Sequence, residues 1–403
     1  MIFTKIKMDN ILAKSAKKIS GVQTGFRRYL HGNIDWSSRL VGIKGARGAG
    51  KTTLALQYLA NHKASLTEKL YVSLDDLYFV ENNLVSLADE FVKRGGLVLV
   101  LDEVHRYKNW SQEVKNIYDD HPELHVIFTG SSLLHINQSK ADLSRRAVVY
   151  ELRGLSFREY VNLQANKSYQ PIAIAEILES HTPIATEIST SLKPIRYFQE
   201  YIMHGYYPYF LEGESGYTEK LMNTLLLSLE NDLPALHEIQ HATIGKIKQL
   251  LAIISESVPF KPNIAKLSDR IGSTRNSLNT YLHYLEELRI ISSLTSASKG
   301  ISQLQKPEKI YLFHPNLQHA FAVKPDVGSM RESFFLNQVS ALFSIHSSPT
   351  ADFIVNRQWT FEVGGASKTT RQIKNTKQAY LALDGIEIGF HEKIPLWLFG
   401  FLY

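Results

Sequence analysis

The stretch LVGIKGARGAGKTTLALQYLA, residues 40–60, decides the fold. A short apolar run from Leu40 to Ile43 leads into a glycine-rich turn, and apolar residues at helical spacing follow the turn. The turn fits the pattern Gly-x-x-x-x-Gly-Lys-Ser/Thr, in which backbone N–H groups surround a phosphate and a helix N-terminus adds its positive dipole end. A glycine-rich turn without a ligand is the alternative, and the flanking strand and helix disfavour it.

The spacing within this loop assigns a task to each residue. Glycines allow the backbone N–H groups to turn inward without Cβ clashes. Lys51 is expected to reach the β- and γ-phosphates of a nucleotide, and the Thr52 hydroxyl is expected to coordinate Mg²⁺. The expected nucleotide-binding residues are Gly45, Ala46, Arg47, Gly48, Ala49, Gly50, Lys51, Thr52 and Thr53.

A second motif, GGLVLVLDEVHRYKNW at residues 95–110, predicts a buried parallel strand that ends in two acids. Ligands of open α/β sheets bind at the carboxyl ends of the strands. Asp102 is therefore expected to hold Mg²⁺ through water, and Glu103 to polarise the water that attacks the phosphate. Two acids at the start of a loop would be the alternative without the phosphate-binding loop upstream.

Two further stretches complete the predicted layout. LHVIFTGSSLL, residues 124–134, predicts a buried strand that places Thr129 near the γ-phosphate, although a simple strand end gives the same pattern. Arg145 and Arg146 precede another predicted strand, residues 147–152. An arginine there can act as a finger in the site of a neighbouring subunit. A surface pair of arginines is the alternative.

The chain resembles the AAA-type ATPases of bacteria and archaea whose ATP-binding domain is joined to a C-terminal domain of unknown function. The matching stretches are GIKGARGAGKTTLALQYL, LVLVLDEVHRYKNW, VIFTGSSLL, LSRRAVVYELRGLSFREYV, YIMHGYYPYF and PEKIYLFHPNLQHAF. Members of this group usually carry Ser-Gly-Arg where this chain has Ser144-Arg145-Arg146, so the resemblance makes Arg146 the catalytic arginine and leaves the role of Arg145 open. It implies ATP and Mg²⁺ as cofactors and ATP hydrolysis, and it implies no substrate beyond ATP.

Composition limits the remaining function classes. The chain has 403 residues, which is long enough for two or three domains. Of these residues 44% are hydrophobic and 21% are charged, which is typical of a globular protein. No run approaches the roughly eighteen apolar residues of a membrane span, and the N-terminus lacks an apolar signal region, so we expect a cytoplasmic protein without membrane contact. With no cysteine, disulfides, thiolate metal sites and a cysteine nucleophile are excluded.

The net charge of +6 is concentrated at the N-terminus. Residues 1–31 carry seven basic residues against one acidic residue, which leaves the rest of the chain nearly neutral. We expect a basic arm over residues 1–32 that touches nucleic acid phosphates or an acidic partner. A solvated basic helix ahead of the first domain is the alternative.

The α/β pattern ends near residue 160. Residues 161–245 are rich in helix formers and aromatic residues, and the AAA resemblance implies a helical lid there. Tyr206, Tyr207 and Tyr209, in a predicted turn between helices, either stack on a base or, as we expect, pack beneath the lid.

Residues 246–300 predict a winged helix. A helix from Ile264 to Ile271, a turn at Gly272 and a second helix capped by Ser273 precede β-branched residues. The second helix of such a unit can enter the major groove of DNA, for which Arg275, Asn276 and Asn279 are the candidates. Glu286 and Glu287 make its later half acidic, so packing on the ATPase or on a protein partner stays open.

Residues 301–403 predict a small α/β domain of the restriction-endonuclease-like kind. In TFEVGGASKTT, residues 360–370, Glu362 follows Asp352 at the distance of a metal pair on adjacent strands, and Glu332 can supply a third carboxylate. Gly364 stands where such nucleases carry their lysine. Lys368 is the alternative, but two intervening glycines argue against a preorganised site, so we expect an inactive domain.

The predicted fold is thus an α/β P-loop NTPase of AAA type with a parallel sheet (residues 33–160), followed by a helical lid, a winged helix and a nuclease-like domain. The predicted function is Mg²⁺-dependent ATP hydrolysis that controls DNA or protein binding by the C-terminal domains. An ATP-gated switch with little turnover and an ATP-regulated nuclease are the alternatives. An arginine finger supplied in trans would also require a homo-oligomer.

Overall fold

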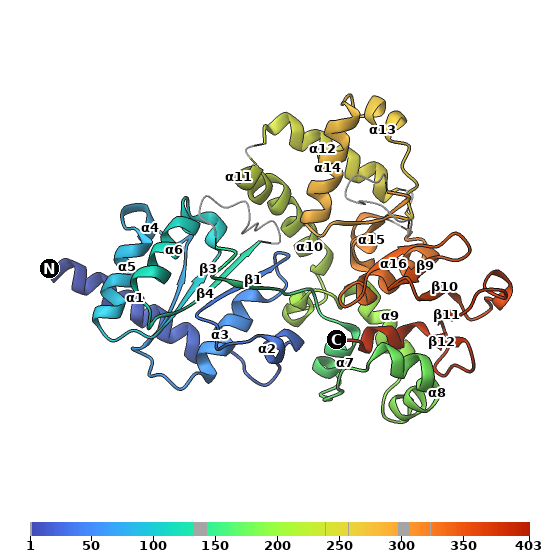
Figure 1. The fold of residues 1–403 in the computed structure, drawn as a ribbon, viewed down its shortest axis with the longest axis horizontal. Helices are drawn as coiled ribbons and strands as arrows, with labels where there is room; N and C mark the ends of the chain where they lie inside the picture. Colours follow the sequence, from blue (N-terminus) through green and yellow to red (C-terminus); the bar gives the residue numbers. More distant parts are fainter. Residues whose placement is uncertain (1, 132–142, 238, 257, 297–306, 323) are drawn as a thin grey trace. The chain divides into compact units, whose positions relative to one another are not determined.

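The computed structural model describes residues 2–131, 143–237, 239–256, 258–296, 307–322 and 324–403 (Figure 1). The chain divides into two compact units. The first contains Met1–Arg153 together with Ser228–Ile239, and the second contains Gly154–Leu227 together with Gln240–Tyr403. A short segment, residues 228–239, therefore belongs to the first unit although both of its neighbours in sequence belong to the second.

A five-stranded parallel sheet forms the centre of the first unit, in the order β2-β3-β4-β1-β5. This arrangement confirms the prediction of an α/β fold of the P-loop NTPase class. The strands are nearly continuous apolar runs because both faces of the sheet are covered. Their bounds are β1 (Leu40–Gly45), β2 (Lys69–Ser73), β3 (Val98–Asp102), β4 (His125–Ser131) and β5 (Val148–Glu151).

Alternate residues of β3 feed two separate apolar cores. Leu99 and Leu101 pack on one face with residues of α5 (Leu84–Lys93) and α6 (Trp110–Asp120), whereas Val98 and Val100 pack on the other with residues of α3 (Lys51–Asn61). The helices of this unit are α1 (Ile2–Ser20), α2 (Tyr29–Asn33), α3 (Lys51–Asn61), α4 (Tyr78–Glu81), α5 (Leu84–Lys93), α6 (Trp110–Asp120) and α11 (Leu233–His237).

The basic N-terminal segment packs on the sheet as part of the first unit, where the sequence predicts a separate arm. Met8 and Ile19 of α1 are buried in the two apolar cores, one on each. The Ser15 hydroxyl accepts a hydrogen bond of 2.8 Å from the backbone N–H of Tyr71 in β2. Burial of these three positions explains why the helix is held against β2. Contact with nucleic acid stays a prediction for its basic side chains.

The second unit combines helices with two sheets, ordered β12-β11-β10-β9-β8 and β6-β7. Its strands are β6 (Ile291–Leu294), β7 (Lys309–Leu312), β8 (Ile345–Ser347), β9 (Phe353–Val355), β10 (Trp359–Gly365), β11 (Ala379–Asp384) and β12 (Lys393–Pro395). Its α-helices are α7 (Phe157–Gln164), α8 (Ile174–Ser191), α9 (Pro194–His204), α10 (Tyr217–Leu227), α12 (His241–Ser255), α13 (Ile264–Arg270), α14 (Arg275–Glu287), α15 (Pro315–Phe321) and α16 (Val327–Val339).

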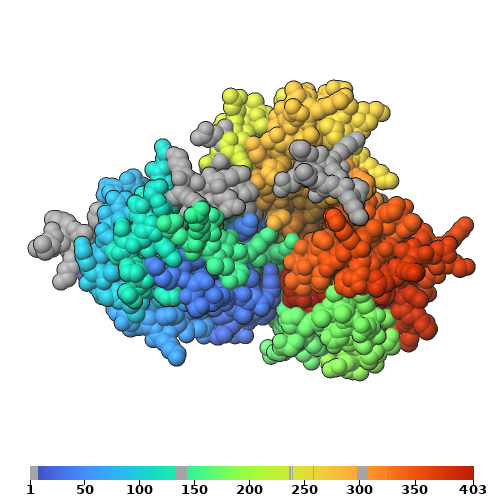
Figure 2. Space-filling model, in the orientation of Figure 1, coloured from blue at the N-terminus to red at the C-terminus, as the bar shows by residue number. Residues whose placement is uncertain are grey.

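Most of the predicted lid segment packs with the C-terminal part of the chain. Phe157 of α7 meets the Phe401 ring edge-on with ring centroids 5.8 Å apart, and Phe198 of α9 meets Phe334 of α16 at 4.7 Å. The Ser156 hydroxyl donates to the backbone carbonyl of Tyr403 at 2.6 Å. In Figure 2 the green atoms of α7 and α8 lie against the orange and red atoms of the C-terminal segment. The observed unit therefore crosses the predicted boundaries at residues 160 and 245.

Residues 241–294 form three helices, α12, α13 and α14, followed by β6, the first strand of a hairpin. The sequence predicts the last two helices and the strand in this order. The cap of α14 is Thr274 and not the predicted Ser273, because the Thr274 hydroxyl accepts the N–H of Ser277 at 3.1 Å. Glu286 accepts the N–H of Ser293 at 2.8 Å and so ties the end of α14 to β6. The predicted boundary at residue 300 lies outside the described residues. No helix in the described ranges is long and apolar enough to cross a membrane.

Candidate functional site

The loop between β1 and α3 takes the conformation that its glycines allow. Gly48 and Gly50 have φ angles of 78° and 97°, in the left-handed region that favours glycine. Helix α3 begins at Lys51, directly after Gly50. The buried Arg28 guanidinium braces the loop, since it donates to the carbonyl oxygen of Ala49 at 2.6 Å and to that of Arg153 at 2.8 Å. The loop is thus held in a curve with its helix N-terminus facing inward.

The Lys51 side chain is buried at the centre of this loop. Its ammonium group donates to the carbonyl oxygens of Gly45 at 3.0 Å and Ala46 at 3.1 Å. Burial lowers the pKa of Lys51, and the carboxylates of Glu103 and Asp102 oppose that shift. The lysine therefore lies between the loop backbone and the acidic end of β3.

The Asp102 carboxylate accepts hydrogen bonds from hydroxyl groups of three neighbouring elements. Its Oδ2 accepts from Thr52 of α3 at 2.7 Å and from Tyr71 of β2 at 2.6 Å, while its Oδ1 accepts from Thr129 of β4. Burial, and then the charge of Asp102, raise the pKa of the Tyr71 hydroxyl, which therefore stays a donor. Among the predicted residues Thr52, Asp102 and Thr129 are thus brought together at one point, the carboxyl edge of the sheet.

Glu103 points away from this cluster. Its backbone is left-handed, with φ 56° and ψ 40°, and its N–H donates to the Thr129 hydroxyl at 3.3 Å. Its carboxylate lies 3.4 Å from Nε2 of His105. The left-handed region is uncommon outside glycine. The turn that Glu103 makes in this conformation places the two consecutive acids in two different environments.

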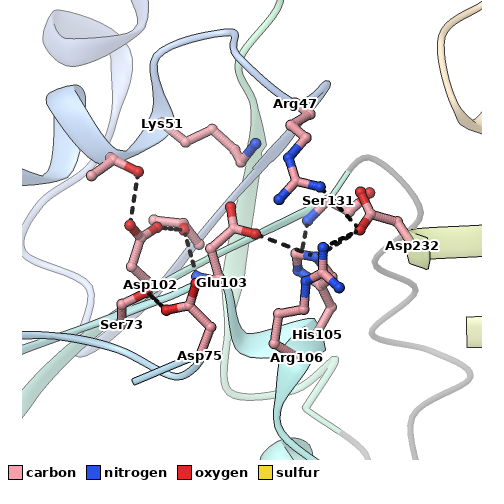
Figure 3. A network of polar contacts seen from close by, with 12 residues as sticks. Arg47, Lys51, Ser73, Asp75, Asp102, Glu103, His105, Arg106, Ser131 and Asp232 are labelled. Atoms are coloured by element: carbon pink, nitrogen blue, oxygen red, sulfur yellow. Dashed lines mark hydrogen bonds and ion pairs between the residues drawn. The ribbon is translucent and has the colours of Figure 1, made fainter. Parts of the chain in front are cut away.

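A second polar cluster surrounds Asp232, on the segment that returns to the first unit. Arg106 donates to the Asp232 carboxylate at 2.8 Å, Arg47 lies 3.5 Å from it, and His105 lies 3.8 Å from it. Figure 3 shows these three side chains pointing toward Asp232, with the Glu103 carboxylate directed at His105. Burial opposes ionisation of Asp232, but the His105 contact and the two guanidinium groups lower its pKa overall.

Comparison with known proteins agrees with this geometry. The family model described as an AAA domain matches residues 37–161, which contain the loop, Asp102, Glu103 and Thr129. Residues 37–161 are thus similar to an AAA domain, and this matched segment is called the AAA domain below. A second model, a domain of unknown function (DUF8612), matches residues 195–326. No curated protein shows significant similarity to the sequence.

Several solved structures are similar to the chain. AMPPCP-bound DnaA from Aquifex aeolicus is 16% identical with a TM-score of 0.27, over 62% of this chain and 82% of that one. PCH-2 from C. elegans is 14% identical with a TM-score of 0.25, over 70% and 66% of the two chains. The S. cerevisiae Hsp104–ADP complex is 16% identical with a TM-score of 0.27, over 70% and 39%.

Two of the predicted residues lie at the edge of the AAA domain site. Thr53 is exposed on the first turn of α3. Arg146, the predicted finger, forms a two-point ion pair with Asp119 of α6, at 2.9 Å from Nε and 3.1 Å from one terminal nitrogen. The structure thus places Arg146 beside α6, and its role as a finger stays a prediction.

Several residues of the AAA domain site escape sequence reasoning. Tyr71 carries no motif and is recognised only by its bond to Asp102. His105 and Arg106 are separated from the acidic pair only by Val104, and that proximity is a usable signal. Asp232 gives no signal at all, because the hydrogen bonds that place it span 126 and 185 residues.

Lys368 reaches back across the two glycines, and its Nζ lies 2.5 Å from Oε1 of Glu362. This contact forms although the freedom of Gly364 and Gly365 argues against a preorganised site, and the expected inactivity of the domain stays a prediction. The space above Gly364 is filled by the Lys368 side chain itself.

Proposed function

We propose that the AAA domain binds ATP with Mg²⁺ and hydrolyses the bond between its β- and γ-phosphates. The observation that carries this proposal is the 2.7 Å contact between the Thr52 hydroxyl and the Asp102 carboxylate, beside the phosphate-binding loop. Oxygen donors of this kind suit Mg²⁺, which is held by few protein groups together with water and phosphate.

Each side chain then has a distinct task. Lys51 would exchange the carbonyls of Gly45 and Ala46 for phosphate oxygens, and the loop N–H groups would hold the β-phosphate. Mg²⁺ bound at Thr52 and Asp102 would neutralise charge on the phosphates. Glu103 would orient and polarise the attacking water, while Thr129 would align that water or the γ-phosphate.

Support for the two acids having different tasks comes from their surroundings. Asp102 is surrounded by three hydroxyl donors, which stabilise a fixed carboxylate. Glu103 has only the imidazole of His105 within ion-pair distance among its described contacts, and its side chain is 21% exposed. A carboxylate that is partly exposed and weakly held is free to turn toward a water molecule.

We further propose that the nucleotide state controls binding by the second unit. Residues 241–294 and the β6-β7 hairpin follow the element order of a winged helix, and Arg275, Asn276 and Asn279 are exposed at the start of α14. These positions suit contact with DNA bases, whereas the acidic end of α14 suits a protein partner. An ATP-gated switch with slow turnover uses the same residues.

Steady-state hydrolysis and equilibrium binding of ATP, measured with Mg²⁺, test the proposal. Lys51→Ala should lose nucleotide binding, because the Lys51 ammonium group lies inside the loop, within 3.1 Å of the carbonyl oxygens of Gly45 and Ala46. Glu103→Gln should bind ATP normally and hydrolyse it at least about 100-fold more slowly, since a general base contributes on that scale. Asp120→Asn, an exposed change on α6, serves as the control. Full turnover by Glu103→Gln would sink the assignment of the base.

Adding double-stranded DNA at low salt extends the same assay. Stimulation that disappears as salt rises would favour DNA as the partner, because phosphate contacts release counterions. Turnover indifferent to DNA would favour a protein partner.

A further inference from the structure

A cavity lies beneath helix α1, on the side of the nucleotide-binding site where β2 ends. Its volume is about 790 Å³, and all of its lining residues belong to the first unit. Three parts of the chain form its walls: one face of α1, the first turns of α3, and the end of β2 with the α4 segment that follows. Pockets of this size commonly hold a small organic molecule.

The face of α1 that borders the cavity carries basic and apolar residues at helical spacing. Four lining residues have the spacing i, i+3, i+4 and i+7, which places them on one side of a helix: Ile11, Lys14, Ser15 and Lys18. Lys17 also lines the cavity, next to Lys18 in sequence. The three lysines are exposed. Three basic residues that solvent reaches therefore line one cavity.

The cavity lining has an excess of positive charge. Asp76 is the one acidic residue among the described lining residues, and its Oδ2 lies 3.3 Å from Nζ of Lys14. Nζ of Lys18 lies 4.6 Å from the ring centroid of Tyr71, so this ammonium group is directed toward the cavity wall. Three lysines against one aspartate leave two positive charges without an acidic counterpart in the lining. The lining therefore suits an anion.

The rest of the wall is largely apolar. Its aliphatic and aromatic side chains are Val22, Leu56, Tyr71, Val72, Tyr78 and Phe79. The rings of Tyr78 and Phe79 meet edge-on with centroids 5.1 Å apart. The residues on either side of this pair, Leu77 and Val80, are 83% and 78% exposed. Apolar surface thus continues from the wall to the outside, and an apolar ligand body would remove part of it from water.

Two wall residues also belong to the hydroxyl shell of Asp102. Thr52 and Tyr71 donate to its Oδ2 at 2.7 Å and 2.6 Å. Of the predicted nucleotide-binding residues 45–53, all of which the structure describes, Thr52 alone lines the cavity. The cavity is therefore a separate site that shares Thr52 and Tyr71 with the surroundings of Asp102.

We propose that this cavity binds a small organic anion with an apolar body and a carboxylate or phosphate head, and that its occupancy strengthens the binding of Mg²⁺·ATP through Tyr71. The head lies among Lys14, Lys17 and Lys18, and the body packs on the apolar wall. The anion site itself does not depend on ATP chemistry. The coupling to Mg²⁺·ATP rests on the proposed function.

Tyr71 gives the coupling its direction. Its ring is part of the cavity wall, and its hydroxyl donates to the carboxylate that is proposed to hold Mg²⁺. A ligand body packed on the ring favours the conformation in which Tyr71 holds Asp102, which is the conformation that Mg²⁺·ATP requires. Linkage makes the effect reciprocal, so Mg²⁺·ATP tightens binding of the anion by the same factor.

A lysine surface that contacts nucleic acid phosphates explains less of this arrangement. Phosphate contacts require exposed basic side chains and no apolar cavity. Here the lysines border a cavity of about 790 Å³ whose wall includes Val22, Leu56 and Phe79. Inorganic phosphate and double-stranded DNA therefore serve as competitors in the test.

Calorimetric titration of the full chain with naphthalene compounds tests the site. 1-Naphthyl phosphate and 1-naphthoate share one apolar body and differ in their heads, and 1-naphthalenemethanol has the same body without charge. The Lys51→Ala background without nucleotide keeps the phosphate-binding loop from contributing. We expect one site for at least one anion, with the alcohol at least about tenfold weaker, since hydrogen bonds to charged groups contribute on that scale. The tighter anion identifies the head group.

Variants in the lining locate this binding. Lys17→Ser combined with Lys18→Ser should weaken it at least about tenfold. Val22→Trp, which fills part of the cavity, should weaken it as well. Lys93→Ser, a change of an exposed lysine on α5 outside the lining, should bind as the parent does.

Three results would overturn the anion site. They are no binding of either anion, equal binding of the alcohol, and displacement of the bound anion by inorganic phosphate or DNA at equal phosphate concentration. The last result would show that the lysines act without the cavity.

The coupling is measured in the chain with Lys51 intact. The tighter of the two anions, at saturation, should lower the Kd of Mg²⁺·ATP at least about fivefold. Tyr71→Phe keeps the ring and lacks the hydroxyl, so it should still bind the anion and lose this effect. Unchanged ATP affinity, or coupling that persists in Tyr71→Phe, would overturn the coupling. A chain that binds the anion and no ATP would contradict the proposed function and leave the anion site standing.

Discussion

At the scale of single residues, the first glycine of the nucleotide-binding loop serves packing as well as phosphate binding. A Cβ atom at position 45 would lie 2.2 Å from the carbonyl oxygen of Leu152, just after β5. The Leu152 backbone is held in place, because its N–H donates to the carbonyl oxygen of Lys44 at 2.8 Å. A Cβ atom at position 45 would therefore collide with the backbone at the edge of the sheet, so the loop can pack there only with glycine at this position.

Gly45→Ala should therefore destabilise the AAA domain by about 1–3 kcal/mol or more, the range for overpacking against atoms that cannot yield. Chemical denaturation of the full chain, followed by a probe in residues 37–161, measures the change. Gly32→Ala is the matched control, because the described structure has nothing within 4 Å of a Cβ there. Equal free energies of unfolding for the two variants would show that the backbone after β5 shifts to accommodate the Cβ atom, and would contradict the prediction.

At the scale of elements, the cap of α15 gives the second unit a pH dependence. Nδ1 of His314 accepts the N–H of Asn316 at 3.3 Å, and Nε2 is buried without a partner in the described structure. The ring stacks on Tyr206 with centroids 3.9 Å apart. Burial, and then the charge of His319, lower the pKa of His314 well below its ordinary value, so the folded chain holds this imidazole neutral.

Acidification should consequently destabilise the second unit. Below the ordinary pKa near 6.5 the His314 imidazole binds a proton in the unfolded chain and stays neutral in the folded chain. The free energy of unfolding therefore falls as pH falls. One such group contributes about 1.4 kcal/mol per pH unit in that window. His314→Asn keeps a capping oxygen and should flatten the slope between pH 6.5 and pH 5 in denaturation curves, by about that amount. Exposed His241→Asn should leave it unchanged.

Sequence patterns predict elements well where each depends on its own residues. The apolar runs of β1, β3 and β4 and the glycine-rich loop identify the parallel sheet and its nucleotide edge without any tertiary information. They fail where position depends on distant partners. Asp232 reaches the site through its contacts with Arg106 and Arg47. Lys368 reaches Glu362 because Gly364 leaves space for its side chain, whereas the sequence spacing alone indicates a missing lysine at position 364.

At the scale of the whole molecule, Arg146 connects the site to the oligomeric state. Its ion pair with Asp119 holds it beside α6, and a finger would act on the nucleotide of another subunit. Arg146→Ala should keep ATP binding and lose turnover by about 10³-fold, the contribution of such fingers. Turnover per subunit in the wild type should also rise with protein concentration. A flat dependence, with Arg146→Ala fully active, would exclude a finger supplied in trans.

The segment that carries Asp232 links the two units through the chain itself. Residues 228–239 belong to the AAA-containing unit, while α10 before them and α12 after them belong to the other. Arg47 of the phosphate-binding loop lies 3.5 Å from Asp232. A phosphate bound at the loop would compete with Asp232 for Arg47. Nucleotide binding should therefore weaken the ion pair between Arg47 and Asp232 and lower the local stability of α10 and α12.

Hydrogen exchange in α10 and α12, with and without Mg²⁺·ATP, measures that effect. It is best followed in the Glu103→Gln variant, which keeps the nucleotide intact. We expect faster exchange in both helices on ATP binding, and we expect Asp232→Asn to show the fast rate already without ATP, because the contact with Arg47 is lost in advance. Asp120→Asn, an exposed change of the same chemistry in the same unit, should behave as the parent. If Asp232→Asn still responds to ATP as the parent does, the nucleotide signal leaves the AAA domain by another route.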